Sequence, residues 1–349
     1  MSSTRRTVGI GLAGLGRMGR IHADDLAGRC ATARLACVQD ADPAVAREAG
    51  ERYGVPWVSS FAELLAHDDV GAVAIATPTG THAELTVQAA RAGVDVFCEK
   101  PISLDRATTV ATVEEVERSG IVFQVGFHRR FDPDWVAVAE RIHAGELGDV
   151  ALFRTSLRDM ASPPAAFLAG SGGFFRDVTV HDLDVARWMV GEVVEVTAHG
   201  AAVSDPEAFA AIGDVDTAVV VLRFANGALG VIDNSRASGY GYECSTEIMG
   251  SRATARIDAP HRRNYEWRTP GAATTDLVKD FQERYPWAYA EELDAFARCV
   301  RDRTRPRVSG TDALAAFDLA EAADLSWRSG RSVAVRYAGT GYEIAGATV

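Results

Sequence analysis

The 349-residue sequence has few cysteines, and no two of them form a C-x-x-C pair. Their number is odd and they are widely scattered, which is typical of reduced thiols in a cytosolic protein. This pattern argues against a disulfide framework and against a cysteine zinc site. We therefore expect small core residues at these positions, which are Cys30, Cys37, Cys98, Cys244 and Cys299.

Positive charge is also scarce. Lysine and arginine together number 36, against 48 aspartate and glutamate residues, so the formal net charge is −12 and the pI is near 5.2. Nucleic acids and other polyanions are usually bound by basic faces. The composition therefore argues against a nucleic-acid partner, and an anionic cofactor would need local positive potential.

Long apolar runs are absent as well. No stretch reaches the roughly 18 apolar residues that cross a membrane. Arg5-Arg6 precedes an apolar stretch and so resembles a twin-arginine export signal. The same apolar stretch has the pattern of a first strand and a glycine turn. Cleavage of a signal peptide would remove both, which argues against an export signal. We expect a soluble cytoplasmic protein with no membrane partner.

A glycine turn lies near the N-terminus. The apolar run Val8 to Leu12 leads into Gly14, Gly16 and Gly19, after which apolar residues return at helical spacing. In a G-x-G-x-x-G turn the first glycine permits the sharp turn, the second lets backbone approach a pyrophosphate, and the third lets the helix pack closely. The amides at the helix start then face the anion. The candidate cofactor contacts are Gly14, Leu15, Gly16, Arg17, Met18 and Gly19.

An acidic residue follows the next expected strand. Ala33 to Gln39 is apolar, and Asp40 comes about 20 positions after the last glycine, where dinucleotide-binding folds place an acid on the ribose hydroxyls. A carboxylate there would repel a 2′-phosphate, although neighbouring Arg47 would soften that effect. NAD is therefore the expected cofactor.

Two further strand ends carry polar residues. From Arg34 to Phe127, short apolar runs alternate with helical patterns, which predicts a parallel sheet with helices on both faces and ligands beyond the carboxyl ends of its strands. One end carries Thr77-Pro78, with His82 shortly after. The other carries Glu99-Lys100-Pro101, where the proline would direct the Lys100 side chain inward. The Lys100-Pro101 peptide bond is a candidate for the cis isomer. For His82, a helix-terminal role near the dipole and cofactor contact are equally good interpretations.

The pattern changes to longer strands and hairpins after Arg129. Asn226-Gly227 is a strong hairpin turn, and a predominantly antiparallel sheet with flanking helices is expected. We predict an α/β protein with a doubly wound parallel sheet over residues 1–128 and a second α/β domain over residues 129–349. The strands expected in the second domain are Asp149 to Thr155, Val193 to Val203, Asp216 to Phe224, Ala228 to Ile232, Glu243 to Met249 and Ala253 to Ile257.

Asp177 and His181 are four residues apart, so a helix would place both on one face. A carboxylate beside an imidazole can hold its tautomer and stabilise its charged form, as in other general-base pairs. The alternative is an ordinary surface pair. Asp182 and Asp184 follow, and for these we expect a solvated or interface face of the helix.

These motifs together resemble the glucose-fructose oxidoreductase and inositol dehydrogenase (Gfo/Idh/MocA) family along essentially the whole chain, most closely its inositol 2-dehydrogenase branch. The resemblance rests on the glycine turn, Thr77-Pro78, Glu99-Lys100-Pro101, Gly126 to Phe131, Arg158-Asp159 and Gly172 to Asp184. It implies a Rossmann domain, a second α/β domain whose open sheet face mediates homo-oligomers (a tetramer or dimer), and NAD-dependent oxidation of a cyclic polyol, most closely myo-inositol to its 2-ketone.

The resemblance also implies roles for particular residues. His181, oriented by Asp177, would remove the hydroxyl proton, and Lys100 would stabilise the developing alkoxide, so that no metal is required. The resemblance places Arg129, Asp159 and Tyr240 near the polyol, and Tyr242 is the alternative to Tyr240. The non-functional alternatives for these three positions are an exposed arginine, an aspartate in a turn and a packed tyrosine. His128 stands where many relatives are expected to have asparagine or methionine, and this leaves the particular inositol or sugar open.

Other functions remain compatible with the sequence. The same three residues would serve a dehydrogenase of another inositol, an aldose or an amino-sugar intermediate. An NAD-dependent glycosidase would release a sugar without net NADH. A non-catalytic dinucleotide sensor would not need Lys100, Asp177 and His181 together. Stoichiometric NADH formation with myo-inositol separates these possibilities.

Overall fold

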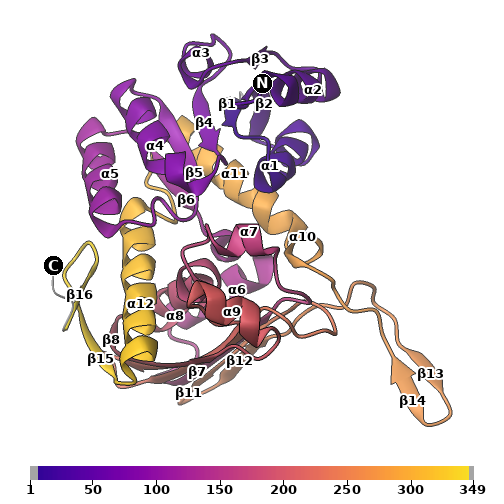
Figure 1. The fold of residues 1–349 in the computed structure, drawn as a ribbon, viewed down its shortest axis with the longest axis vertical. Coiled ribbons are helices and arrows are strands. Elements are labelled where there is room, and N and C mark those ends of the chain that lie inside the picture. The colour runs from indigo at the N-terminus through magenta and orange to yellow at the C-terminus, as the bar shows by residue number, and fades with distance from the viewer. Residues whose placement is uncertain (1–6, 346–349) are drawn as a thin grey trace. The chain divides into compact units, whose positions relative to one another are not determined.

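The computed structural model describes residues 7–345, so the Arg5-Arg6 pair lies outside the described residues. The chain forms two compact units (Figure 1). Unit 1 contains the chain up to Asp132 together with Trp287–Leu314, and unit 2 contains Pro133–Pro286 and the chain from Ala315 onward. None of the helices among the described residues is both long and apolar enough to span a membrane.

Unit 1 is built on a six-stranded sheet in the order β3-β2-β1-β4-β5-β6, and every neighbouring pair is parallel. This confirms the predicted doubly wound sheet. The order reverses between β1 and β4, the position at which such sheets bind ligands. The strands are β1 Val8–Ala13, β2 Ala33–Gln39, β3 Trp57–Val58, β4 Ala72–Ile75, β5 Asp95–Glu99 and β6 Phe123–Gly126.

Helices alternate with these strands, because each parallel crossover needs one. The helix α2 begins after Asp42, whose side chain accepts a hydrogen bond from the Ala44 amide, and ends before Gly54, which has a φ of 67°. The helical segments are α1 Arg17–Gly28, α2 Pro43–Tyr53, α3 Phe61–Leu65, η1 Thr79–Thr81, α4 His82–Arg91, α5 Arg106–Ser119 and η2 His128–Phe131.

A helix from late in the chain completes unit 1. In α11 (Pro286–Asp302), Leu293 and Phe296 are fully buried in the same apolar cluster as Ile10 of β1. Asp294 fixes the helix to the start of β2, because its Oδ1 accepts hydrogen bonds from the amides of Thr32 (2.7 Å) and Ala33 (3.1 Å). The core of unit 1 therefore includes a segment remote in sequence.

Unit 2 is built on an eight-stranded sheet in the order β12-β11-β7-β10-β9-β8-β15-β16. Its pairs are antiparallel except for β7 with β10, so the predicted mostly antiparallel sheet is confirmed. Gly227 has a φ of 89° in the predicted hairpin turn. The strands are β7 Val150–Arg158, β8 Val193–Ala201, β9 Thr217–Phe224, β10 Leu229–Ser235, β11 Glu243–Gly250, β12 Thr254–Ile257, β15 Val333–Tyr337 and β16 Tyr342–Ile344.

The remaining elements of unit 2 are helices and one small hairpin. The hairpin of β13 (Trp267–Thr269) and β14 (Ala272–Thr274) extends away from the eight-stranded sheet (Figure 1). The division between the units falls within α12 (Gly310–Ser329), after Leu314. The other helical segments are α6 Pro133–His143, α7 Ala165–Leu168, η3 Phe175–Thr179, α8 Val180–Val190, α9 Pro206–Ile212 and α10 Phe281–Arg284.

The expectation for Asp182 and Asp184 is wrong, because both are buried on α8. The Asp182 carboxylate accepts hydrogen bonds from Thr155 Oγ1 of β7 (3.1 Å) and Asn234 Nδ2 of β10 (2.9 Å). A carboxylate bonded to two strands anchors α8 on the sheet, and the sequence pattern contains no sign of these partners.

Candidate functional site

The glycine turn of unit 1 connects β1 to α1. Gly14 has a φ of 90°, and a Cβ on it would lie 2.6 Å from the Thr77 amide nitrogen. A Cβ on Gly19 would overlap the Gly14 carbonyl oxygen, whereas a Cβ on Gly16, the residue that caps α1, would meet nothing within 4 Å. The turn therefore packs tightly against the end of β4 and leaves open space at the start of α1, as an anion-binding turn requires.

Asp40 lies beside this turn, directly after β2. Its Oδ2 accepts a hydrogen bond from the Leu15 amide (2.8 Å), and its Oδ1 accepts one from the Asp42 amide (3.0 Å). Each ionised carboxylate oxygen can accept further hydrogen bonds. The carboxylate is thus held at the end of the strand with acceptor capacity to spare.

Thr77 and Pro78 follow β4 and form a small turn with Thr81. The hydroxyls of Thr77 and Thr81 are 2.7 Å apart, and Thr81 Oγ1 donates to the Pro78 carbonyl oxygen at 2.9 Å. Pro78 is exposed and Thr77 is half-buried, so both lie at the surface of unit 1, and Thr77 lies beside Gly14.

His82 connects the ends of two strands. It is only 2% exposed, and its Nδ1 and Nε2 each lie 2.8 Å from a carbonyl oxygen, of Pro101 and of Thr77 respectively. Carbonyl oxygens only accept hydrogen bonds, so both ring nitrogens must carry protons. Burial alone would lower the pKa of His82, but the Cys98 side chain and the two carbonyls raise it to about 9. The charged ring therefore fixes Thr77 relative to Pro101.

Glu99-Lys100-Pro101 ends β5, and the Lys100-Pro101 bond is cis, the isomer that the sequence left as a candidate. Glu99 is buried, and its two carboxylate oxygens have separate partners. Its Oε1 lies 2.7 Å from His22 Nε2, and its Oε2 accepts a hydrogen bond from the Lys100 amide at 3.2 Å. The backbone on either side of Lys100 is consequently held, at Glu99 and at Pro101.

His128 and Arg129 are both buried at the end of β6, with 6% and 2% of their surfaces exposed, so the alternative of an exposed arginine is wrong. The His128 ring stacks on Tyr289 of α11, with centroids 4.7 Å apart.

Asp177 and His181 belong to unit 2, where the local helix is not regular. Residues 175–179 form a π-helix, and α8 begins at Val180, so the two residues lie on either side of a change in helical pitch. π-helices are rare and frequently mark functional sites. The predicted i, i+4 geometry of one regular helix is therefore altered, because a π-helix has i→i+5 hydrogen bonds and a wider turn than an α-helix.

Arg236 is a partner of Asp177 that sequence reasoning missed. Its guanidinium is 1% exposed, lies over the Phe174 ring, and places Nη2 at 3.0 Å from Asp177 Oδ2. A buried arginine paired with a carboxylate orients that carboxylate strongly. The segment around Ser235-Arg236 carries no spacing that would have indicated this pair.

Of the two candidate tyrosines, Tyr240 is the accessible one. It is 51% exposed and its hydroxyl donates to Glu243, which also pairs with Arg158 Nη1 at 2.9 Å. Tyr242 is 7% exposed and packs edge-on against Tyr285. Asp159 directly follows β7, and its carbonyl accepts a hydrogen bond from the Ser238 amide at 2.8 Å.

Two protein-family models match most of the chain. The oxidoreductase-family NAD-binding Rossmann fold (GFO_IDH_MocA) matches residues 8–127. The oxidoreductase-family C-terminal alpha/beta domain (GFO_IDH_MocA_C) matches residues 139–335. The two matches correspond to the two sheets described above.

Similar proteins cover nearly the full length. Inositol 2-dehydrogenase of Rhizobium meliloti is 39% identical, over 94% of this chain and 99% of its own. Myo-inositol 2-dehydrogenase of Thermotoga maritima is 41% identical, over 93% and 97% respectively. A solved structure of scyllo-inositol dehydrogenase from Lactobacillus casei, with bound NAD(H) and scyllo-inositol, has a TM-score of 0.86 at 29% identity, covering 94% of this chain and 99% of that one.

Proposed function

Because the chain belongs to the Gfo/Idh/MocA oxidoreductase family, we propose that it oxidises one hydroxyl of a cyclic polyol to a ketone with NAD, most closely myo-inositol to 2-keto-myo-inositol. The observation that carries this proposal is the likeness to inositol 2-dehydrogenases over more than nine-tenths of the chain. Scyllo-inositol is the second candidate substrate, because a relative bound to it has nearly the same fold.

Purified protein with NAD and a panel of polyols tests the proposal. We expect one NADH per ketone formed with myo-inositol or scyllo-inositol, followed by absorbance, and slower formation with aldoses. Release of a sugar from a glycoside without net NADH would instead indicate a glycosidase. Tight NADH binding with no turnover of any polyol would indicate a sensor.

The residues of unit 1 fit NAD. The tight Gly14 turn, the open space at Gly16 and the fixed carboxylate of Asp40 supply a pyrophosphate cradle and a ribose acceptor on neighbouring strands. We assign the contacts with NAD to the turn Gly14 to Gly19, to Asp40, and to Thr77, Pro78, His82, Glu99 and Lys100 at the two strand ends. When bound, NAD supplies the hydride acceptor.

We assign the chemistry to Lys100 of unit 1 and to Asp177 and His181 of unit 2. His181 takes the proton of the reacting hydroxyl as the C–H bond gives up its hydride, and the carbon–oxygen bond becomes a ketone. Asp177, fixed by Arg236, holds the imidazole in orientation. The Lys100 ammonium donates to the oxygen while negative charge develops there. The remaining hydroxyls of the polyol are assigned to His128, Arg129, Asp159 and Tyr240.

Asp40→Ala is expected to weaken NAD binding by about 10- to 100-fold relative to NADP, because hydrogen bonds to a charged group contribute about 1.5–3 kcal/mol. Asp40→Asn is the matched control, since its amide oxygen can still accept from the Leu15 amide but carries no charge to repel a 2′-phosphate. Fluorescence titration with NADH and NADPH measures the ratio. An unchanged ratio in both variants would remove the ribose role of Asp40.

We propose that the chain forms a homo-oligomer, a tetramer or a dimer, through the open face of its eight-stranded sheet. Along β9 the side chains alternate between buried and exposed, and the exposed face carries Val219 and Val221, with Leu229 of β10 and Met249 of β11 also exposed. Apolar side chains on adjacent strands are typical of an interface.

We expect Val221→Lys to shift the mass measured by light scattering to that of a smaller species. Val203 is an exposed valine outside the sheet, so Val203→Lys is the control and should leave the mass unchanged. An unchanged mass in Val221→Lys would place the interface elsewhere.

We also propose that the protein acts in the cytoplasm. All five cysteines are free thiols in the structure, and three of them are buried, which suits a reducing compartment.

A further inference from the structure

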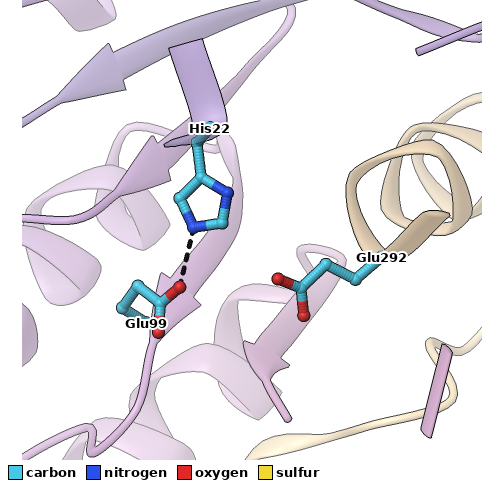
Figure 2. Close-up of side chains that lie close together, drawn as sticks. All are labelled: His22, Glu99 and Glu292. Carbon is cyan, nitrogen blue, oxygen red and sulfur yellow. Dashed lines mark hydrogen bonds and ion pairs between the residues drawn. The ribbon is translucent and has the colours of Figure 1, made fainter. Parts of the chain in front are cut away.

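Three ionisable side chains meet in the core of unit 1, on elements far apart in the sequence. Figure 2 shows His22 of α1, Glu99 of β5 and Glu292 of α11 around one point. His22 and Glu292 are completely buried and Glu99 is 7% exposed. His22 Nε2 and Glu99 Oε1 are 2.7 Å apart, a charge-assisted hydrogen bond when the imidazole is protonated.

Glu292 has no such partner. Neither carboxyl oxygen of Glu292 has a hydrogen-bond partner among residues 7–345, although its backbone carbonyl accepts from Gln124 Nε2 at 2.7 Å. Leaving an ionised carboxylate buried in this way is very costly, whereas a neutral carboxylic acid is much cheaper to bury. Burial raises the pKa of Glu292 well above its ordinary range, and the neighbouring carboxylates of Glu99 and Asp25 raise it further.

The charges around Glu292 are already matched. The groups that face it are His22 and Asp25 of α1 and Glu99 of β5, while Tyr289 of α11 lies edge-on to the His22 ring. Asp25 pairs with Arg29 Nη1 at 2.7 Å, and Glu99 pairs with His22. No positive charge in this set is left over for a third carboxylate.

A metal ion would need a different arrangement of the same residues. Two ligands of one tetrahedral zinc ion, each about 2.0–2.2 Å from the metal, lie roughly 3.3 Å apart. The 2.7 Å separation of His22 and Glu99 is shorter and has the length of a hydrogen bond. The geometry thus favours a shared proton over a shared metal.

We propose that Glu292 is kept as a neutral carboxylic acid so that His22 and Glu99 can pair undisturbed, and that this pair positions Lys100. The link to Lys100 is the second oxygen of Glu99, which accepts the Lys100 amide hydrogen at 3.2 Å. A charge on Glu292 would repel Glu99 and compete for the proton of His22. His22 and Glu99 are then positioning residues. Their effect on the reaction rests on the proposed function of Lys100.

The first test concerns only the protonation of Glu292. Glu292→Gln replaces a neutral acid by a neutral amide of the same shape, so we expect wild-type kcat and KM. A carboxyl whose pKa is raised in the folded state takes up a proton on folding, and therefore loses stability as the pH rises above the unfolded value of about 4.3. We therefore compare the folded-to-unfolded ratio of Glu292→Gln with that of the wild type. Above this pH the variant's ratio should increase relative to the wild type's by up to about tenfold per pH unit, and below it this increase should vanish.

Denaturant titrations of both proteins from pH 4 to pH 9, with metal analysis of the wild type by mass spectrometry, measure this. A variant that is less stable than the wild type at pH 8 would overturn the neutral assignment. Stoichiometric divalent metal in the wild type, lost in Glu292→Gln, would replace it by a metal site.

The second test concerns positioning. His22→Leu removes the donor to Glu99 and should lower kcat by about 10²-fold, the cost of a misplacement of about 1 Å, with little change in NADH affinity. His22→Gln keeps a nitrogen donor at similar reach and should restore most of kcat. If His22→Leu does not fold, His22→Met, which also lacks the donor to Glu99, replaces it and should show the same fall in kcat with little change in NADH affinity.

Wild-type kcat in His22→Leu, or in His22→Met where that variant replaces it, would overturn the positioning role while leaving the result for Glu292 intact. Full activity of a Lys100 variant would instead defeat the proposed function itself, so the two failures are distinguishable.

Discussion

Lys100→Ala is expected to lower turnover of myo-inositol by about 10²–10³-fold, the typical effect of removing one donor to a developing oxyanion. The residue lies between two fixed points, the Glu99 carboxylate that holds its amide and the Pro101 carbonyl that binds His82. Its charged group is thus delivered from a rigid strand end, which limits the reorganisation needed during reaction. NADH affinity should change little, because the glycine turn and Asp40 remain in place.

Stopped-flow absorbance of NADH with purified variants measures this effect. The chain contains only one other lysine, the exposed Lys279, so Lys279→Ala is a matched control that should retain wild-type turnover. Lys100→Arg keeps the charge but changes the size and geometry of the donor, and should recover only part of the loss. Wild-type turnover in Lys100→Ala would exclude the lysine from the chemistry.

His181→Ala is expected to lower turnover by about 10²–10⁴-fold, the usual contribution of a positioned general base. The loss should fall on kcat, since NAD is assigned to residues of unit 1. His261, which is exposed and lies outside the eight-stranded sheet, provides the control, and His261→Ala should have no effect.

The buried Arg236 allows a further test of the role of Asp177 in orienting His181. If Asp177 orients His181, then Arg236→Met, which removes the partner of Asp177, should lower kcat in the same direction as Asp177→Ala. The double variant should then lose less than the product of the two single losses, because both changes act through one carboxylate. Strictly multiplicative losses would mean that Arg236 supports only the fold. Added imidazole that restores turnover in His181→Ala would further support the base assignment.

Much of unit 1 could be predicted from the sequence because its signals are local. A parallel strand buried on both faces needs a continuous apolar run, and a turn with a φ of 90° at Gly14 needs glycine. The positions of Asp40 and Lys100 at strand ends were predicted for the same reason, since each directly follows a strand with such a run. In unit 2 the alternation of apolar and polar residues predicted six of the eight strands of the large sheet, with Asn226-Gly227 marking one turn, whereas β15 and β16 were not predicted.

The contacts that hold the candidate site were not predictable. The Asp177–Arg236 pair joins residues 59 positions apart, and the His22–Glu99 hydrogen bond joins residues 77 positions apart. The π-helix before α8 changed the helical geometry that the prediction for Asp177 and His181 had assumed. Asp182, expected at a solvated or interface face, instead bonds to two strands.

The sequence by itself therefore determined most of the strands, the glycine turn and the positions at which reactive side chains follow a strand, because backbone geometry and burial act on neighbouring residues. Only the tertiary structure decided that α11 completes the core of unit 1, that Arg236 holds Asp177 and that Glu292 is buried beside Glu99. These outcomes depend on hydrogen bonds and desolvation between distant segments, and neither leaves a periodic mark on the chain.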